Sequence, residues 1–298
     1  NIQTGSGEFL IEGGVGHKEK VIKIYYHKPK TFQPQSRILI VIPGSGRNGD
    51  SYRDSWKEES EKYGVLILAP MYPESEYGFG DYHLGGLMYD FSLEESVTYV
   101  ENSNQVILDE ESFSFKVNAN ADEWIFNDFD GLFESVVIAI GSEQTEYDIF
   151  GHSAGGQILH RFTIFLPNSK ANRIVASNSG FYTLPDFSSD LPFGVKNTPM
   201  TEAKLESSFK KHLVLFIGEL DNEDEKGGIL LRSPSVDKQG LHRLARGRFF
   251  YYEAKTISEK LGFDFNWELV IIPNVGHNYR KMGKAAAEFL YDQKEDKS

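Results

Sequence analysis

A serine flanked by glycines forms the most informative motif of the chain. Residues 151–155 read Gly-His-Ser-Ala-Gly, a pattern in which the serine occupies a tight turn between a strand and a helix. The preceding run, 147–150, is strand-like, and the following run, 157–162, is helical in character. A helix start offers free N–H groups and a positive dipole end, which stabilise negative charge beside Ser153. This context predicts that Ser153 is a nucleophile rather than part of an ordinary glycine turn.

A serine hydroxyl needs a base to remove its proton, and the chain has eight histidines to supply one. His277 follows the last apolar strand-like run, 268–272, and is the predicted base. His152 is next to Ser153, but we expect its side chain to point away and to serve packing or orientation. His83 lies in an aromatic stretch and is the other histidine that could enter a substrate pocket.

The histidine in turn needs a carboxylate that orients it and stabilises its charged form. Asp221 stands just after the apolar run 213–217, between the serine and the histidine in chain order. Asp224 in the same acidic loop is the alternative. The order Ser153, Asp221, His277 differs from the orders found in chymotrypsin-type and subtilisin-type chains.

Two N–H donors are also needed to hold an oxyanion during acyl transfer. The turn geometry predicts the N–H of Ala154 as one of them. The loop 43–49, Pro-Gly-Ser-Gly-Arg-Asn-Gly, follows an early strand and predicts the N–H of Ser45 as the other. The alternatives are a plain glycine turn and a phosphate loop, but the Gly-x-x-x-x-Gly-Lys-[Ser/Thr] spacing is absent.

These residues lie on an alternation of strand and helix patterns that predicts an α/β fold. Such alternation is typical of a mostly parallel central sheet with helices on both faces. The expected strands are 21–26, 38–42, 65–69, 147–150, 173–177, 213–217 and 268–272, and the expected helices are 51–63, 126–140, 154–166, 241–261 and 279–291.

Two stretches interrupt this alternation, and we interpret both as insertions over the sheet edge. Residues 71–124 contain a Gly- and Tyr-rich loop and an expected hairpin that joins 105–108 to 112–117, and residues 179–208 are rich in Pro and Phe. No repeat or linker is visible, so residues 1–298 are expected to form a single domain. The aromatic insertions suggest a substrate pocket or satellite core, with tentative substrate contacts at Tyr82, His83, Phe181 and Tyr182.

Together, these motifs resemble the α/β-hydrolase family. The resemblance rests on 43–46, 151–155, 218–221 and 276–277 and extends from about residue 37 to residue 291. Within the family, the early loop and the element order look like the feruloyl-esterase-like and polyhydroxybutyrate-depolymerase-like esterases. The resemblance implies an α/β-hydrolase fold and a serine esterase acting on carboxylic esters without a cofactor.

Composition and net charge limit which binding partners and cofactors we expect for this chain. A net charge of −13 would be repelled by phosphate backbones and anionic lipids, so nucleic acid is not an expected partner. Cysteine is absent, which excludes disulfides and thiolate chemistry, and no His-Glu-x-x-His motif points to a metal. Apolar runs are too short to span a membrane. The chain begins at Asn1 without a leader, which favours a mature secreted or periplasmic form over a cytoplasmic one.

The predicted function is therefore hydrolysis of a small or polymeric ester by Ser153, His277 and Asp221. The same groups can cleave amides, so a serine peptidase or amidase is the close alternative. A noncatalytic binding protein that retains the fold is the alternative from a different class.

Overall fold

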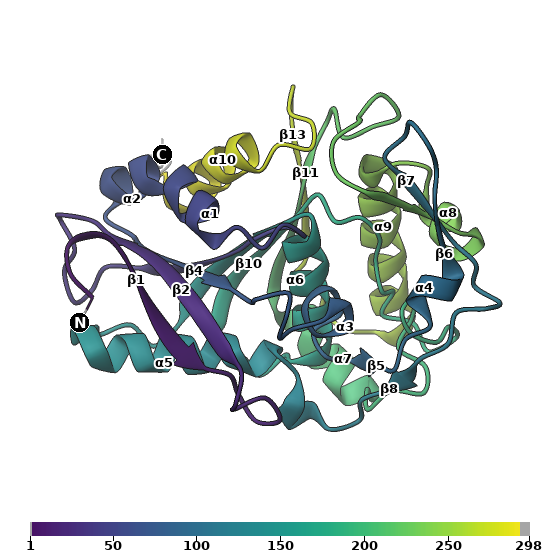
Figure 1. Cartoon of the computed structure of the whole chain (residues 1–298), viewed down its shortest axis with the longest axis horizontal. Helices are drawn as coiled ribbons and strands as arrows, with labels where there is room; N and C mark the ends of the chain where they lie inside the picture. Colours follow the sequence, from purple (N-terminus) through teal and green to yellow (C-terminus); the bar gives the residue numbers. More distant parts are fainter. Residues whose placement is uncertain (1, 293–298) are drawn as a thin grey trace.

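An eight-stranded sheet forms the centre of the protein, for which a computed structural model describes residues 2–292 (Figure 1). The strands, in spatial order, are β1 (Gly5–Glu12), β2 (Val21–Lys28), β4 (Leu66–Met71), β3 (Ile38–Ile42), β9 (Tyr147–His152), β10 (Ala171–Ser177), β11 (His212–Gly218) and β13 (Glu268–Ile272). Neighbours from β4 to β13 run parallel, whereas β1 pairs with β2, and β2 with β4, in antiparallel fashion. The predicted α/β class with a mostly parallel sheet is confirmed.

Helices cover both faces of this sheet, as predicted. One face packs against α1 (Gly49–Ser55), α2 (Lys57–Tyr63) and α10 (Tyr279–Tyr291). The other face carries α5 (Phe126–Ile140), α6 (Ala154–Phe165), α7 (Glu202–Lys210) and α9 (Arg243–Leu261). Within residues 2–292, none of these helices combines the length and apolar character needed to cross a bilayer.

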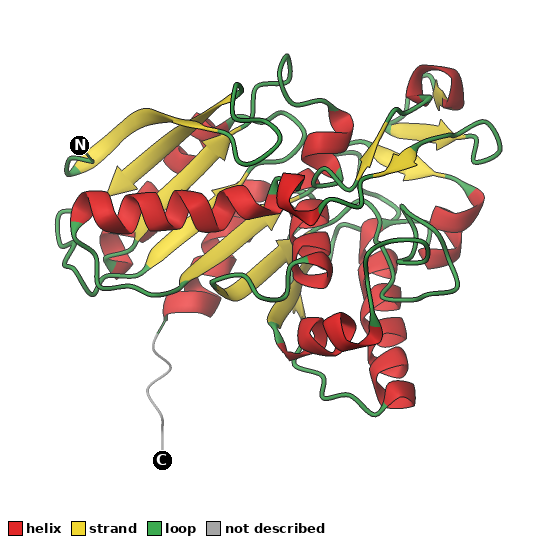
Figure 2. Cartoon of the chain, turned by 90° about the horizontal axis from the view of Figure 1, so that it is seen from below, coloured by secondary structure: helices red, strands yellow, loops and turns green. Residues whose placement is uncertain are grey.

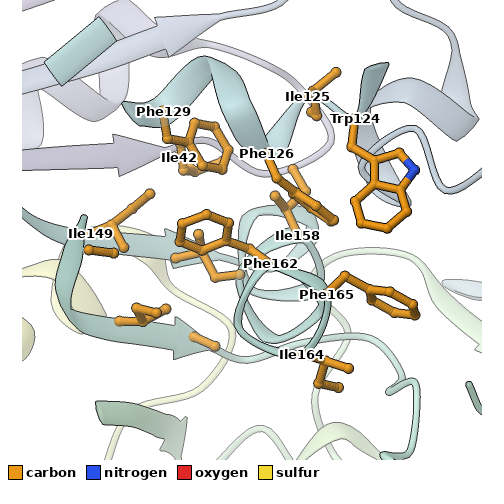
Figure 3. Close-up of a cluster of buried hydrophobic side chains, with 14 of the residues drawn as sticks. Ile42, Trp124, Ile125, Phe126, Phe129, Ile149, Ile158, Phe162, Ile164 and Phe165 are labelled. Atoms are coloured by element: carbon orange, nitrogen blue, oxygen red, sulfur yellow. The ribbon is translucent and has the colours of Figure 1, made fainter. Parts of the chain in front are cut away.

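The interface of α5, α6 and β9 is the part of the core that fixes the position of the serine turn. Figure 3 shows Phe126 and Phe129 of α5 facing Ile158 and Phe162 of α6. The rings of Phe129 and Phe162 meet edge to face, with centroids 5.3 Å apart. Burying one such side chain stabilises the fold by about 2 kcal/mol, so α6 is held rigidly at its position on the sheet.

Small sheets, rather than the expected hairpin, occupy the first insertion. Strand β7 (Gln105–Leu108) pairs antiparallel with β6 (Val97–Tyr99) and parallel with β12 (Leu230–Arg232), while β8 (Lys116–Val117) pairs with β5 (Met88–Tyr89). Figure 2 shows these short strands beside the main sheet. The hairpin prediction was wrong because alternation marks strands but does not identify their partners. The single-domain organisation stays a prediction.

Other differences are local. The expected helix 51–63 is interrupted at Trp56, a buried residue that ends α1 and precedes α2. Strand β1 was not predicted, and the region 179–208 ends inside α7. The remaining short elements are α3 (Phe79–His83), α4 (Leu93–Ser96), a 3₁₀ turn (Ala121–Glu123) and α8 (Pro234–Gln239).

Candidate active site

The residues singled out in the sequence converge at the carboxyl edge of the parallel strands. Strands β3, β9, β11 and β13 end at Ile42, His152, Gly218 and Ile272. The loops that follow them carry Pro43–Gly46, Ser153, Asp221 and His277. Parallel strands end on the same edge, which is where α/β folds place their ligands.

Ser153 occupies a strained turn between β9 and α6. Its backbone has φ 59° and ψ −114°, outside the regions that L-residues usually adopt. Glycines on both sides permit the close packing: a Cβ on Gly151 would lie 2.5 Å from the carbonyl O of Gly155, and a Cβ on Gly155 would lie 2.3 Å from the carbonyl O of Ile42. The turn therefore requires glycine at both positions.

Three side chains form one hydrogen-bonded chain at this edge. His277 Nε2 lies 3.0 Å from Ser153 Oγ, and His277 Nδ1 lies 2.7 Å from Asp221 Oδ2. The alternative carboxylate, Asp224, is solvent-exposed. The structure thus brings together Ser153, His277 and Asp221 and leaves Asp224 outside the group.

Asp221 is almost fully buried yet surrounded by donors. Besides His277, it accepts hydrogen bonds from Arg243 Nη1 at 3.0 Å and from Asn178 Nδ2 at 2.6 Å. Burial alone would raise the pKa of Asp221, but the bond to His277, the charges of His277 and Arg243, and the bond from Asn178 lower it to about 2. The carboxylate is therefore ionised near neutral pH.

Neither of these additional donors was predicted from the sequence. Asn178 directly follows β10, so the rule that strand ends meet at one edge could have identified it. Arg243 begins helix α9, 22 residues after Asp221, and no motif connects the two.

The loops also hold His277 through its backbone and its ring. The His277 N–H donates to Glu225 Oε2 at 2.6 Å, and Glu225 Oε1 accepts from Gly227 N at 2.7 Å. The ring of His152 lies against the ring of His277, with centroids 4.7 Å apart, and His152 Nδ1 lies 3.0 Å from Ser177 Oγ. The His152 ring therefore does not point away from the site as expected, but its contact with His277 fits the expected packing role.

The loop after β3 is fixed beside the serine. Tyr82 donates from its hydroxyl to the Pro43 carbonyl at 2.7 Å, and Gly44 N donates to the Tyr52 hydroxyl at 3.0 Å. A Cβ added to Gly44 would lie only 3.5 Å from Ser153 Cβ. The loop therefore packs directly against Ser153.

Both predicted oxyanion donors remain available. Within residues 2–292, the Ser45 N–H has no hydrogen-bond acceptor, and Ser45 is exposed. Ala154 is the first residue of α6, so its N–H has no partner inside the helix.

The aromatic side chains expected to contact substrate lie in the core instead. Tyr82 and Tyr182 are 0% exposed and Phe181 is 5% exposed. All three belong to the main hydrophobic cluster. The expectation of substrate contact is not met for these rings, because aromatic density in a loop does not tell which way the rings face.

His83 is the one tentative contact residue that is only partly buried. Its ring stacks on Phe79, with centroids 4.4 Å apart. Burial, with the positive charges of Arg47 and Arg161 nearby, lowers the pKa of His83 to about 3, so its ring is neutral.

Metal ligands are not grouped in the part of the chain that the structure describes: no three His, Asp or Glu side chains there are placed to hold an ion. Two carboxylates of the loop after β11 are already engaged, Asp221 by side-chain donors and Glu225 by backbone N–H groups.

Solved structures similar to this chain are hydrolases. A poly(aspartic acid) hydrolase from Sphingomonas sp. KT-1 is 31% identical, with 97% of this chain and 100% of that chain covered and a TM-score of 0.81. A poly(3-hydroxybutyrate) depolymerase from Bordetella parapertussis is 23% identical over 97% of this chain and 91% of that one, with a TM-score of 0.80. A siderophore hydrolase from Aspergillus nidulans is 14% identical over 98% and 97%, with a TM-score of 0.55. No family model and no curated protein matches the sequence.

Proposed function

Because this chain belongs to the α/β-hydrolase family, we propose that it is a serine hydrolase that cleaves carboxylic esters through an acyl-enzyme. One observation carries the proposal: the continuous hydrogen-bonded chain from Ser153 Oγ through His277 to the buried Asp221 carboxylate. This arrangement is the one by which a hydroxyl group becomes a nucleophile near neutral pH.

The proposed reaction begins when Ser153 Oγ attacks the acyl carbon. His277 Nε2 takes the serine proton as the new C–O bond forms, and Asp221 stabilises the resulting imidazolium. The N–H groups of Ser45 and Ala154 hold the negative carbonyl oxygen. His277 then returns the proton to the leaving alcohol as the ester bond breaks.

Deacylation repeats these steps with water in place of serine. The water oxygen attacks the acyl carbon while His277 takes a proton from that water. His277 then returns the proton to Ser153 Oγ as the acid is released. The buried position of Asp221 keeps its charge close to His277 in both halves of the reaction.

Amide hydrolysis is the second candidate. The poly(aspartic acid) hydrolase shares 31% identity over nearly the whole chain, and the polymer in its name is linked by amide bonds. The depolymerase named for a polyester is 23% identical. The same hydrogen-bonded chain serves both bond types, so the choice rests on measured preference.

A fluorophosphonate probe tests the nucleophile. The wild-type protein should be labelled at Ser153, and Ser153→Ala should not be labelled, because only an activated serine reacts quickly. An unlabelled wild-type protein would favour a noncatalytic binding protein, and labelling at another serine would exclude the proposed site.

A substrate panel tests the bond preference. We expect p-nitrophenyl esters, a feruloyl ester and 3-hydroxybutyrate oligomers to be turned over faster than an aminoacyl anilide and aspartate oligomers. The reverse ranking would select the amidase. EDTA should leave turnover unchanged, since the proposed steps use side chains and backbone N–H groups and no metal ion.

A further inference from the structure

Arg243 at the start of α9 contacts the candidate triad from the side opposite His277. Its side chain is 2% exposed, and its Nη1 lies 3.0 Å from Asp221 Oδ1, while His277 and Asn178 occupy Oδ2. The two carboxylate oxygens are thus divided between the cation and the base. The backbone joins the same elements, since Leu244 N donates to the Asp221 carbonyl at 3.0 Å.

The same guanidinium also holds the loop that covers His277. Arg243 Nη1 donates to the Gly227 carbonyl at 3.2 Å, and Nη2 donates to the Ile229 carbonyl at 2.8 Å. Between these residues, Gly228 has φ +65°, and a Cβ there would lie 2.7 Å from His277 Nε2. The loop continues into β12, which pairs with β7 of the first insertion. Arg243 therefore links the triad acid to the small sheet.

Charges face His277 from several elements. Asp221 and Glu225 after β11 supply two carboxylates, one at the ring and one at the backbone N–H. His152 of β9 contributes a neutral ring, because burial holds the pKa of His152 well below its usual value. Arg243 is the buried cation that offsets the carboxylates.

We propose that Arg243 is a positioning residue, which fixes the ionised Asp221 and the loop over His277 and offsets the Asp221 charge that acts on the His277 ring. The inference rests on the proposed roles of Ser153, His277 and Asp221. An uncompensated Asp221 would stabilise the imidazolium too strongly, whereas a cation on its second oxygen weakens that stabilisation. The loop bonds keep the ring oriented toward Ser153.

The first test is the pH dependence of fluorophosphonate labelling in Arg243→Gln. Labelling needs no knowledge of the substrate and depends on His277 as the proposed base that activates Ser153. We expect the acid limb of the labelling rate to move to higher pH by about one unit or more, because one charge within about 4–6 Å shifts a titration by that amount. An unmoved limb in a folded variant would overturn the proposal.

Arg243→Lys separates charge from geometry. Lysine keeps the cation but cannot bind the carboxylate and both carbonyls together. We expect an acid limb within about 0.3 unit of the wild type, and faster amide hydrogen exchange over residues 227–232. If Arg243→Gln does not fold, this variant decides alone: faster exchange with an unmoved limb supports the proposal, and wild-type exchange overturns it.

Arg246→Gln is the matched control. Arg246 lies one turn further along α9 and is fully buried, but its ion-pair partner is Asp237, at 3.5 Å. We expect a lower Tm and an unmoved acid limb. An equal shift in this control would assign the effect to general loss of buried charge and overturn the specific role of Arg243. An unlabelled wild-type protein would instead reject the proposed function itself, which keeps the two failures distinct.

Discussion

Two buried arginines of this chain are stabilised in different ways. Arg243 faces a carboxylate, Asp221, and both side chains are at most 2% exposed. Arg161 of α6 is 0% exposed, yet no carboxylate within residues 2–292 lies within ion-pair distance of it. Its donors instead reach Thr183 Oγ1 at 2.8 Å and the His83 carbonyl at 3.0 Å, and Phe181 lies under its guanidinium.

This difference affects the pKa values of the ionisable groups in the two regions. Burial lowers the pKa of Arg161 to about 9, whereas Asp221 has a pKa lowered to about 2 despite its burial. A buried charge that is paired with an opposite charge shifts the pKa of a neighbouring ionisable group. A buried charge that is hydrogen-bonded only to neutral oxygens instead holds together the segments that carry those oxygens. The Arg243 region is thus suited to catalysis, and the Arg161 region to holding the insertions on α6.

The largest expected effect is the difference in kcat between variants of the two regions. Ser153→Ala and His277→Ala should each lower kcat by about 10⁶-fold, and the double variant should be little worse, because the groups act as a unit. Arg161→Met should change kcat by less than about tenfold. Steady-state kinetics on folded proteins measure all four. Multiplicative losses in the double variant, or a collapse of kcat in Arg161→Met, would contradict the division.

Stability should separate the regions in a second way. Asp221→Asn leaves Arg243 buried without its counter-charge and should lower the free energy of unfolding by about 3 kcal/mol. Arg161→Met loses hydrogen bonds but strands no opposite charge, so its cost should be about 1–2 kcal/mol. Urea unfolding of both variants gives the comparison. A larger loss in Arg161→Met would mean that the two arginines are stabilised alike.

A third difference between the two regions is in acid sensitivity. His160 beside Arg161 is neutral: Thr183 N donates to its Nε2 at 3.0 Å, and burial holds the pKa of His160 well below its usual value. A folded-state pKa below the unfolded value means that stability is lost as pH falls below about 6.5. Asp221, by the same reasoning, loses its contribution only between about pH 4 and its folded value of about 2.

His160→Gln should therefore flatten the decline in stability between about pH 6.5 and pH 4. Each histidine of this kind contributes a slope of about 1.4 kcal/mol per pH unit. Urea unfolding at a series of pH values measures the slope. His242→Gln is the control, since that ring caps α9 and is only partly buried. An equal flattening in the control would remove the special status of the Arg161 region.

Much of the fold could be predicted because its strongest signals are local. Ile38–Ile42 is an uninterrupted apolar run closed by proline and glycine, and Phe126–Ile140 has a clear helical period ended by Gly141. The break at Trp56 was not predictable, because it depends on burial of the indole against Phe150. The pairing of β7 with β12 joins residues more than 120 positions apart, which local alternation cannot encode.

The residues of the site likewise fall into two groups, those that local sequence signals predict and those that they do not. Ser153 and the order of its partners follow from the ends of strands, which any parallel sheet brings to one edge. Arg243, Glu225 and the ring of His152 reach the site through side-chain geometry with no characteristic spacing. The direction faced by Tyr82 and Phe181 likewise depends on packing, which composition does not specify.

The bond between His277 and Ser153 also bears on how the protein folds. The two residues are 124 positions apart, and His277 and Asp221 are 56 apart. Contacts of such long separation form only after extensive loop closure, so they slow folding and appear late. During refolding, the hydrogen-bonded chain from Ser153 through His277 to Asp221 is complete only when β11 and β13 have joined the sheet. Under the proposed function, labelling of Ser153 by a fluorophosphonate would therefore report that the main sheet has been completed.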